Sequence, residues 1–122
     1  MSAEIQTKHV SDLNLLIVNV SGDYTVSDDT ELLEPCLNEF VEKKCTRCLF
    51  DFRNASFSAQ TLPMLERSEV YEAHDIPRTT KIAGVFNEIT NDAEFGETAL
   101  HNRGWNIKLF TSPDQAAYWL KA

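Results

Sequence analysis

The pattern of apolar and polar positions changes its period along the chain and predicts alternating strands and helices. Glu4 to Val10 alternates Ile5, Thr7 and His9 with Gln6, Lys8 and Val10, and after a two-residue turn Leu13 to Val20 is almost continuously apolar. Alternation is typical of a strand with one buried face, whereas a continuous apolar run is typical of a strand covered on both faces. We therefore expect the second strand near the centre of a sheet, ended by Ser21 to Asp23.

The next segment has helical spacing instead. Its apolar positions fall at i, i+3, i+4, i+7 and i+8, and they are Leu33, Cys36, Leu37, Phe40 and Val41. This spacing predicts a helix to about Lys44, with Ser27, Asp28 and Asp29 offering a cap and first-turn carboxylates. Pro35 has no backbone donor, so either the first turn is irregular or the regular helix begins near Glu34.

The rest of the chain repeats a strand followed by a helix. Predicted strands are Cys48 to Phe52, Lys81 to Phe86 and Asn106 to Phe110, and predicted helices are Thr61 to His74, Asn91 to Asn102 and Pro113 to Leu120, with a polar loop from Ala55 to Gln60. The order β-β-α-β-α-β-α-β-α predicts an α/β fold with a five-stranded mixed, mostly parallel sheet and about four helices. Only the first strand is expected to run antiparallel to its neighbour, because the short turn permits no other pairing.

The last helix is expected to dock through three apolar positions. Ala116, Trp119 and Leu120 form one stripe, so Trp119 should be mostly buried. Ser112 and Pro113 have the form of a helix start, with serine as the cap and proline at the first helical position.

Composition and charge narrow the class of protein. The chain has 122 residues, 43% of them hydrophobic, which fits a single domain over residues 1–122. A formal charge of -8 without a lysine or arginine cluster does not favour nucleic acid as a partner. No apolar run approaches a transmembrane length, the first ten residues lack a signal-peptide core, and three cysteines make a disulfide framework improbable, so we expect a cytoplasmic protein.

The tail from Arg103 to Leu120 carries a resemblance to a known family. It has a glycine, a short strand ending in Phe110, and a helix ending in alanine, tyrosine, tryptophan and leucine. Together with the order of elements and the Leu33 to Pro35 region, this tail resembles the SpoIIAA-like group of the STAS superfamily. The resemblance implies a STAS fold and a largely uncharacterised role, with relatives that include anti-sigma-factor antagonists and domains likened to CRAL-TRIO lipid carriers.

The phosphoswitch branch of that superfamily has a phosphorylated serine in an Asp-Ser-Ser-Gly-like start of the helix after a strand that ends in aspartate. Here Asp51 ends the core of a predicted strand, but Phe57 to Leu62 lacks the second aspartate, the paired serines and the glycine. Ser58 or Thr61 occupies the corresponding place. The resemblance therefore implies these two residues as phosphorylation candidates.

Other candidate chemistry is weak. Cys45 and Cys48 have C-x-x-C spacing, but they follow a helix C-terminus, whereas a redox pair needs its first thiolate at a helix N-terminus. The histidines are scattered and the four glycines are isolated, so we expect no metal site, no cofactor and no catalytic residues. An enzyme would have to use Asp51, Arg53 and His74.

The best candidate binding surface combines a strand end with the following helix start: Arg53, Asn54, Ser58, Gln60 and Thr61. In a parallel sheet, strand C-termini and helix N-termini converge, so backbone donors there can bind an anion or a partner's acidic side chain. Alternatively, Thr61 only caps its helix and Arg53 pairs with a surface carboxylate.

Function is accordingly expected to be non-enzymatic. The preferred hypothesis is a STAS-like regulatory or binding module for a protein partner or a small ligand. The alternative is a small carrier of an apolar ligand or lipid, which would need a cavity on the order of a few hundred Å³. A homodimer also remains open.

Overall fold

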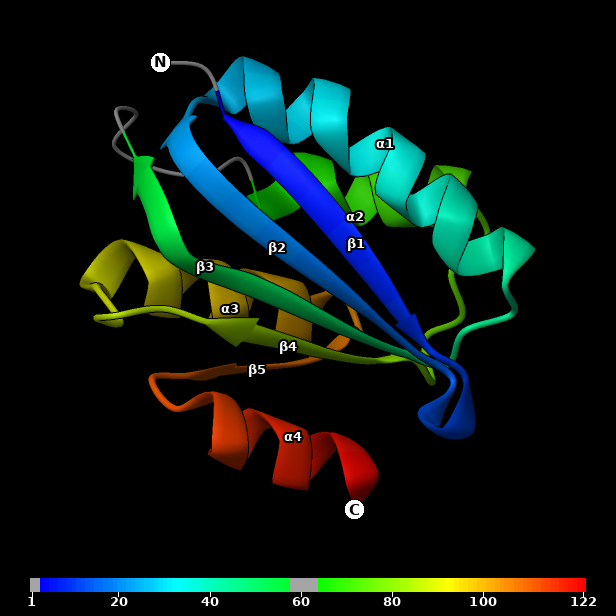
Figure 1. The fold of residues 1–122 in the computed structure, drawn as a ribbon. Coiled ribbons are helices and arrows are strands. Elements are labelled where there is room, and N and C mark those ends of the chain that lie inside the picture. Colours follow the sequence, from blue (N-terminus) through cyan, green and yellow to red (C-terminus); the bar gives the residue numbers. More distant parts are fainter. Residues whose placement is uncertain (1–2, 58–63) are drawn as a thin grey trace.

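The computed structural model describes residues 3–57 and 64–122, and these residues form one five-stranded sheet flanked by helices (Figure 1). The strands are β1 (Glu4–Val10), β2 (Leu15–Tyr24), β3 (Arg47–Phe57), β4 (Lys81–Val85) and β5 (Asn106–Phe110). The helices are α1 (Val26–Glu42), α2 (Met64–Ala73), α3 (Asn91–Asn102) and α4 (Pro113–Lys121), with a 3-10 turn η1 (Ser11–Leu13) between β1 and β2.

The sheet has the order β1-β2-β3-β4-β5. β1 pairs antiparallel with β2, and the other three pairs of neighbours are parallel. The predicted fold class, order of elements and single antiparallel pairing are therefore confirmed. β2 is interior, but the central strand is β3, so the expectation of a central second strand was wrong.

The helices cover the two faces of the sheet unequally (Figure 1). The larger core cluster joins α1, α2 and α3 to one face. It contains Phe40 of α1, Tyr71 of α2 and Leu100 of α3. The smaller cluster joins α4, through Ala116 and Leu120, to the other face. Because α4 has only nine residues, it covers the part of its face formed by β3, β4 and β5.

The strands β2 and β3 are longer than the apolar runs that predicted them. β2 includes Ser21 to Asp23, which were expected to end it, and stops at Tyr24. β3 includes the first part of the segment that was expected to be a polar loop, and it stops at Phe57. Gly22 adopts a φ of 85°, which glycine permits without steric cost, so the residue expected to break the strand is accommodated within it. Pairing between the two extensions supplies the backbone hydrogen bonds that local composition did not predict.

Two local expectations were wrong. Helix α1 runs through Pro35 from Val26, so the regular helix does not begin near Glu34. The β1–β2 connection is the 3-10 turn η1 followed by Asn14 in the left-handed region, with a φ of 51°, and not a two-residue turn. The expected burial of Trp119 is met for most of its side chain: it packs against the smaller cluster with its ring beside Phe110, although Leu120 is the more enclosed of the two.

The predicted start of the last helix is confirmed. Ser112 caps α4, and its Oγ accepts a hydrogen bond of 3.4 Å from the backbone N–H of Gln115. Pro113 stands at the first helical position, where its missing donor costs nothing.

Candidate functional site

Asp51 and Arg53 of β3 form an ion pair near the carboxyl edge of the parallel strands. Arg53 Nη2 lies 2.8 Å from Asp51 Oδ2, and Arg53 Nε donates to Asp51 Oδ1 at 3.0 Å. The backbone N–H of Arg53 also donates to Oδ1, at 3.1 Å. The guanidinium therefore holds the carboxylate through both oxygens, in a geometry that is stronger and more specific than a single contact.

The pair is asymmetric in its exposure. The side chain of Asp51 is 12% exposed, whereas that of Arg53 is 40% exposed. The hydrogen bond from the Arg53 side chain, followed by the backbone bond and the opposite charge, lowers the pKa of Asp51 against the opposing effect of burial. Asp51 is therefore ionised at neutral pH and accepts the hydrogen bonds from Arg53.

A β-bulge explains why Arg53 can return to Asp51. The β2–β3 register pairs Asn19 with Asp51 but Ser21 with Asn54, so two residues of β3, Phe52 and Arg53, oppose a single residue of β2. An extra residue of this kind bends the strand and re-aims its side chains. Phe52 points into the large core cluster, and Arg53 turns back along the strand to reach the carboxylate.

The neighbouring strand completes the polar surface. Asn87 is the second residue after the end of β4, and its Nδ2 donates to the backbone carbonyl oxygen of Arg53 at 2.7 Å. Asn54 and Asn87 are both exposed. Asp51, Arg53, Asn54 and Asn87 therefore form a fixed polar patch, which we call the strand-end patch.

The strand-end patch contains part of the surface predicted from the sequence. It brings together Arg53 and Asn54, while Ser58, Gln60 and Thr61 lie outside the described residues. Arg53 pairs with a carboxylate, as the alternative interpretation expected. Asn87 was missed, although its position immediately after a predicted strand of a parallel sheet was a usable signal.

The three titratable residues suggested for an enzyme do not come together. His74 follows the C-terminus of α2, and its Nδ1 lies 2.9 Å from the carbonyl oxygen of Val70. Its Nε2 lies 3.8 Å from Glu34 Oε1 on α1. Helices that connect parallel strands run back along the sheet, so this helix end lies at the edge opposite Asp51 and Arg53.

The three cysteines are free, buried and poorly suited to chemistry. Burial, reinforced by the charge of Glu39, raises the pKa of Cys36 to about 11. Burial likewise raises the pKa values of Cys45 and Cys48. These thiols are protonated at neutral pH, and a protonated thiol is neither a good nucleophile nor a metal ligand.

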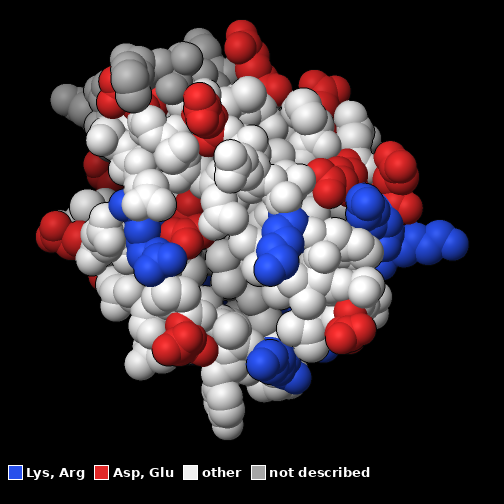
Figure 2. All heavy atoms as spheres, in the orientation of Figure 1, with Lys and Arg blue, Asp and Glu red and all other residues white. Residues whose placement is uncertain are grey.

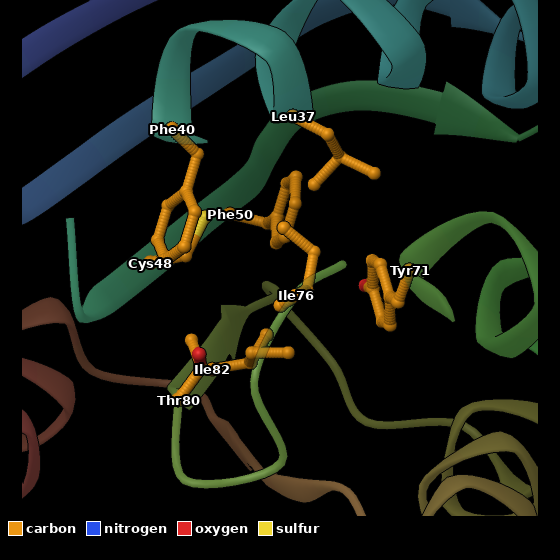
Figure 3. A pocket seen from close by; sticks show the side chains of 8 residues that line it. All are labelled: Leu37, Phe40, Cys48, Phe50, Tyr71, Ile76, Thr80 and Ile82. Carbon is orange, nitrogen blue, oxygen red and sulfur yellow. The ribbon is translucent and has the colours of Figure 1, made fainter. Parts of the chain in front are cut away.

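Figure 3 shows a small apolar cavity between α1, β3 and the segment before β4. Its lining residues are Leu37, Phe40, Cys48, Phe50, Tyr71, Ile76, Thr80 and Ile82. The space open to the centre of a water molecule is only ≈ 10 Å³. This volume has room for about one water molecule. A bound lipid needs a cavity of roughly a few hundred Å³, which is far larger.

Clusters of charged or metal-binding side chains outside the strand-end patch would be further candidate sites. On the face in Figure 2, lysine and arginine side chains are scattered among acidic and uncharged ones. Among the side chains that the structure describes, no three from His, Cys, Asp or Glu lie close enough to hold a metal ion. Over the described residues, no helix is both long and apolar enough to cross a membrane.

Comparison with solved structures gives the fold. An anti-sigma factor antagonist from Mycobacterium paratuberculosis superposes with a TM-score of 0.65 at 15% sequence identity, covering 99% of this chain and 96% of that chain. An uncharacterised Shewanella loihica protein with a SpoIIAA-like fold gives a TM-score of 0.54 at 18% identity, covering 98% of this chain and 93% of that one. This chain has the SpoIIAA-like fold. No family model and no curated protein matches the sequence.

Within this SpoIIAA-like fold, the strand-end patch lies where ligands of open parallel sheets bind in general. Strand C-termini and the following helix N-termini meet at that edge, so polar groups from separate segments become neighbours. The α3 N-terminus is at the same edge, where Thr90 Oγ1 accepts a hydrogen bond of 3.2 Å from the N–H of Ala93. The patch therefore has a structural framework on both β3 and the β4–α3 connection.

Proposed function

We propose that this chain is a non-enzymatic, STAS-like regulatory module that binds a protein partner through the strand-end patch. The observation that carries the proposal is the paired Asp51 and Arg53, held in one orientation by the bulge and by Asn87. A charged pair that is already positioned loses little side-chain freedom when a partner binds, which favours recognition. The anti-sigma factor antagonist with the same fold supports a regulatory role.

Three features favour binding over catalysis. Asp51 is held ionised by Arg53, so it is a poor proton donor near neutral pH. His74 lies away from this pair, and the described cysteines are buried with raised pKa values. The side chains in the patch are acceptors and donors suited to a partner's polar groups.

The carrier alternative receives no support from the cavity in Figure 3. Its ≈ 10 Å³ would have to grow by displacing core side chains such as Phe40 and Phe50, each almost fully buried. Native mass spectrometry of freshly purified protein distinguishes the two functions. A carrier retains an apolar ligand as a discrete added mass, whereas the regulatory module gives the mass of the chain alone or with a modification.

The binding proposal is tested with two matched pairs of substitutions. The variant Arg53→Ala with Asn54→Ala removes exposed side chains of the strand-end patch. Its control, Asn102→Ala with Arg103→Ala, removes the same two residue types from exposed positions at the end of α3. Both variants should remain folded, because substitutions at exposed positions usually change stability by less than about 1 kcal/mol.

The readout is quantitative mass spectrometry of proteins retained on the immobilised chain. A specific partner should bind to the wild type and to the α3 control, and its recovery should fall by about tenfold or more with the patch variant, as expected for loss of a charged contact. Equal recovery with both variants would place the binding surface elsewhere.

Ser58 and Thr61 remain proposed phosphorylation sites of this module. Incubation with ATP and a cell lysate should add the mass of a phosphate to the wild type. The variant Ser58→Ala with Thr61→Ala should then lose that added mass. A phosphate that persists in this variant would assign the modification to another residue.

A further inference from the structure

Strand β1 is the longer of the two edge strands of the described sheet. It has seven residues and no proline, and among the described strands its only neighbour is β2 (Figure 1). An edge strand presents a row of backbone N–H and C=O groups on its outer side, so it is a template for another strand. The side chains of β1 determine which strand can pair with it.

The two faces of β1 are set by its packing. Ile5 packs against the core beneath α1, and Thr7 Oγ1 donates to Glu39 Oε1 of α1 at 2.7 Å. Val10 packs against the cluster of the opposite face. Because side chains alternate along a strand, Glu4, Gln6 and Lys8 share the face of Val10, and all three are exposed.

These three exposed residues are complementary to themselves. If a second β1 pairs antiparallel about a two-fold axis at Gln6, Glu4 of each copy stands opposite Lys8 of the other. Directly opposite side chains in an antiparallel pair have Cβ atoms roughly 4.5–5.5 Å apart, and opposite charges there are stabilising. One register thus forms two Glu–Lys pairs at once.

The other edge of the sheet has the reverse property. β5 has only five residues, and Lys108 is its middle residue. Self-pairing about that residue would place Lys108 opposite its own copy, and like charges directly opposite are destabilising. The charge pattern therefore favours self-association at β1 and disfavours it at β5.

We propose that two copies of this chain associate through antiparallel pairing of their β1 strands, centred on Gln6. The result is one continuous sheet with five strands from each copy. This pairing leaves the strand-end patch on β3 and β4 free, so the dimer is independent of the proposed partner binding. A C2 arrangement satisfies both edges with the same contacts and closes without forming a fibre.

Charge reversal tests the register. Glu4→Lys alone and Lys8→Glu alone each place like charges opposite at two symmetry-related positions. Each should raise the dimer dissociation constant by about tenfold or more in sedimentation velocity, and the double variant should restore wild-type association. Lys108→Glu makes the same charge change as Lys8→Glu on the other edge and should leave the constant unchanged. Added salt should reduce the differences among the variants, because it screens exposed charges.

Cross-linking tests the centre of the pairing. Gln6→Cys places two thiols opposite each other at the axis and should give a covalent dimer under mild oxidation. Lys8→Cys lies on the same strand and face, but its two copies would be about 13 Å apart, four residue steps along the pair, and should not cross-link. The native cysteines do not interfere, because all three are buried.

Three results would overturn the proposal. One is a wild type that stays monomeric at every concentration used for the cross-linking. Another is a dimer whose dissociation constant in both single charge reversals is the same as in the wild type. The third is equal cross-linking at residues 6 and 8. Partner recovery in the earlier experiment is unaffected by any of these results, so the two proposals can fail separately.

Discussion

The hydrogen bond between Trp105 and Ser68 gives the sharpest test of how the helices are held on the sheet. Trp105 Nε1 donates to Ser68 Oγ at 2.8 Å, joining α2 to the segment before β5. The indole ring is 2% exposed and Ser68 is 0% exposed, so water does not replace a lost partner. We expect Ser68→Ala to leave the indole N–H buried without an acceptor.

The cost follows from that burial. A buried donor that loses its partner destabilises a protein by about 1–3 kcal/mol. For a chain of 122 residues this corresponds to a fall in Tm of roughly 4–12 °C. Contacts of the ring with Tyr71, at 5.1 Å between centroids, and with the Arg78 guanidinium, at 3.8 Å, are untouched by the substitution. The effect should therefore report the hydrogen bond.

Urea unfolding followed by circular dichroism measures this free energy. Ser56→Ala is the matched control, because Ser56 is an exposed serine of β3 and should change the free energy of unfolding by less than about 0.5 kcal/mol. In a Trp105→Phe background the donor is absent, so the cost of Ser68→Ala should shrink by about 1 kcal/mol. An equal cost of Ser68→Ala in both backgrounds would show that the hydrogen bond does not contribute.

The remaining predictions concern the last helix, the ion pair and a buried thiol. Leu120→Ala should cost about 2–5 kcal/mol in urea unfolding and Trp119→Ala clearly less, because Leu120 is 1% exposed whereas Trp119 is only partly buried; the reverse order would contradict the packing of α4. Arg53→Gln should raise the pKa of Asp51 in an NMR titration, since hydrogen bonds from Arg53 lower it. In the wild type, the stability from this lowered pKa is present above the ordinary carboxyl range and is lost as the pH falls through the folded-state pKa; an unchanged pKa of Asp51 in the variant would refute the assignment. Cys36, with a pKa of about 11, should react with iodoacetamide at pH 8 far more slowly in the folded than in the urea-unfolded protein, and equal rates would contradict its burial.

The sequence by itself determined the fold class, because periodicity is a local property. Alternation in Glu4 to Val10, the helical spacing from Leu33 to Val41 and the cap at Ser112 each depend on residues close together in the chain. The order of these elements then restricts the topology, since helices between strands require parallel neighbours. For the same reason the short first connection predicted the one antiparallel pair.

Only the tertiary structure decided how far β2 and β3 extend. Residues Ser21 to Asp23 have the composition of a turn, and they become a strand because β3 offers backbone partners to them. The bulge opposite Val20 arises from the same pairing and has no local signal. Strand ends of this kind depend on a partner some 30 residues away, which sequence periodicity does not record.

The candidate site shows the same division. That Arg53 and Asn54 lie near the carboxyl edge of the parallel strands followed from the sequence, since strand C-termini converge in a parallel sheet. The hydrogen bond from the Arg53 side chain to Asp51 depends on the register shift in β3. The hydrogen bond from Asn87 to the Arg53 carbonyl oxygen depends on the neighbouring strand β4. For the last helix, apolar character predicted that both Trp119 and Leu120 pack on the core, but only the packing of α4 made Leu120 the more enclosed of the two. The sequence determines the chemistry of each side chain. Long-range packing determines which other residues become its neighbours.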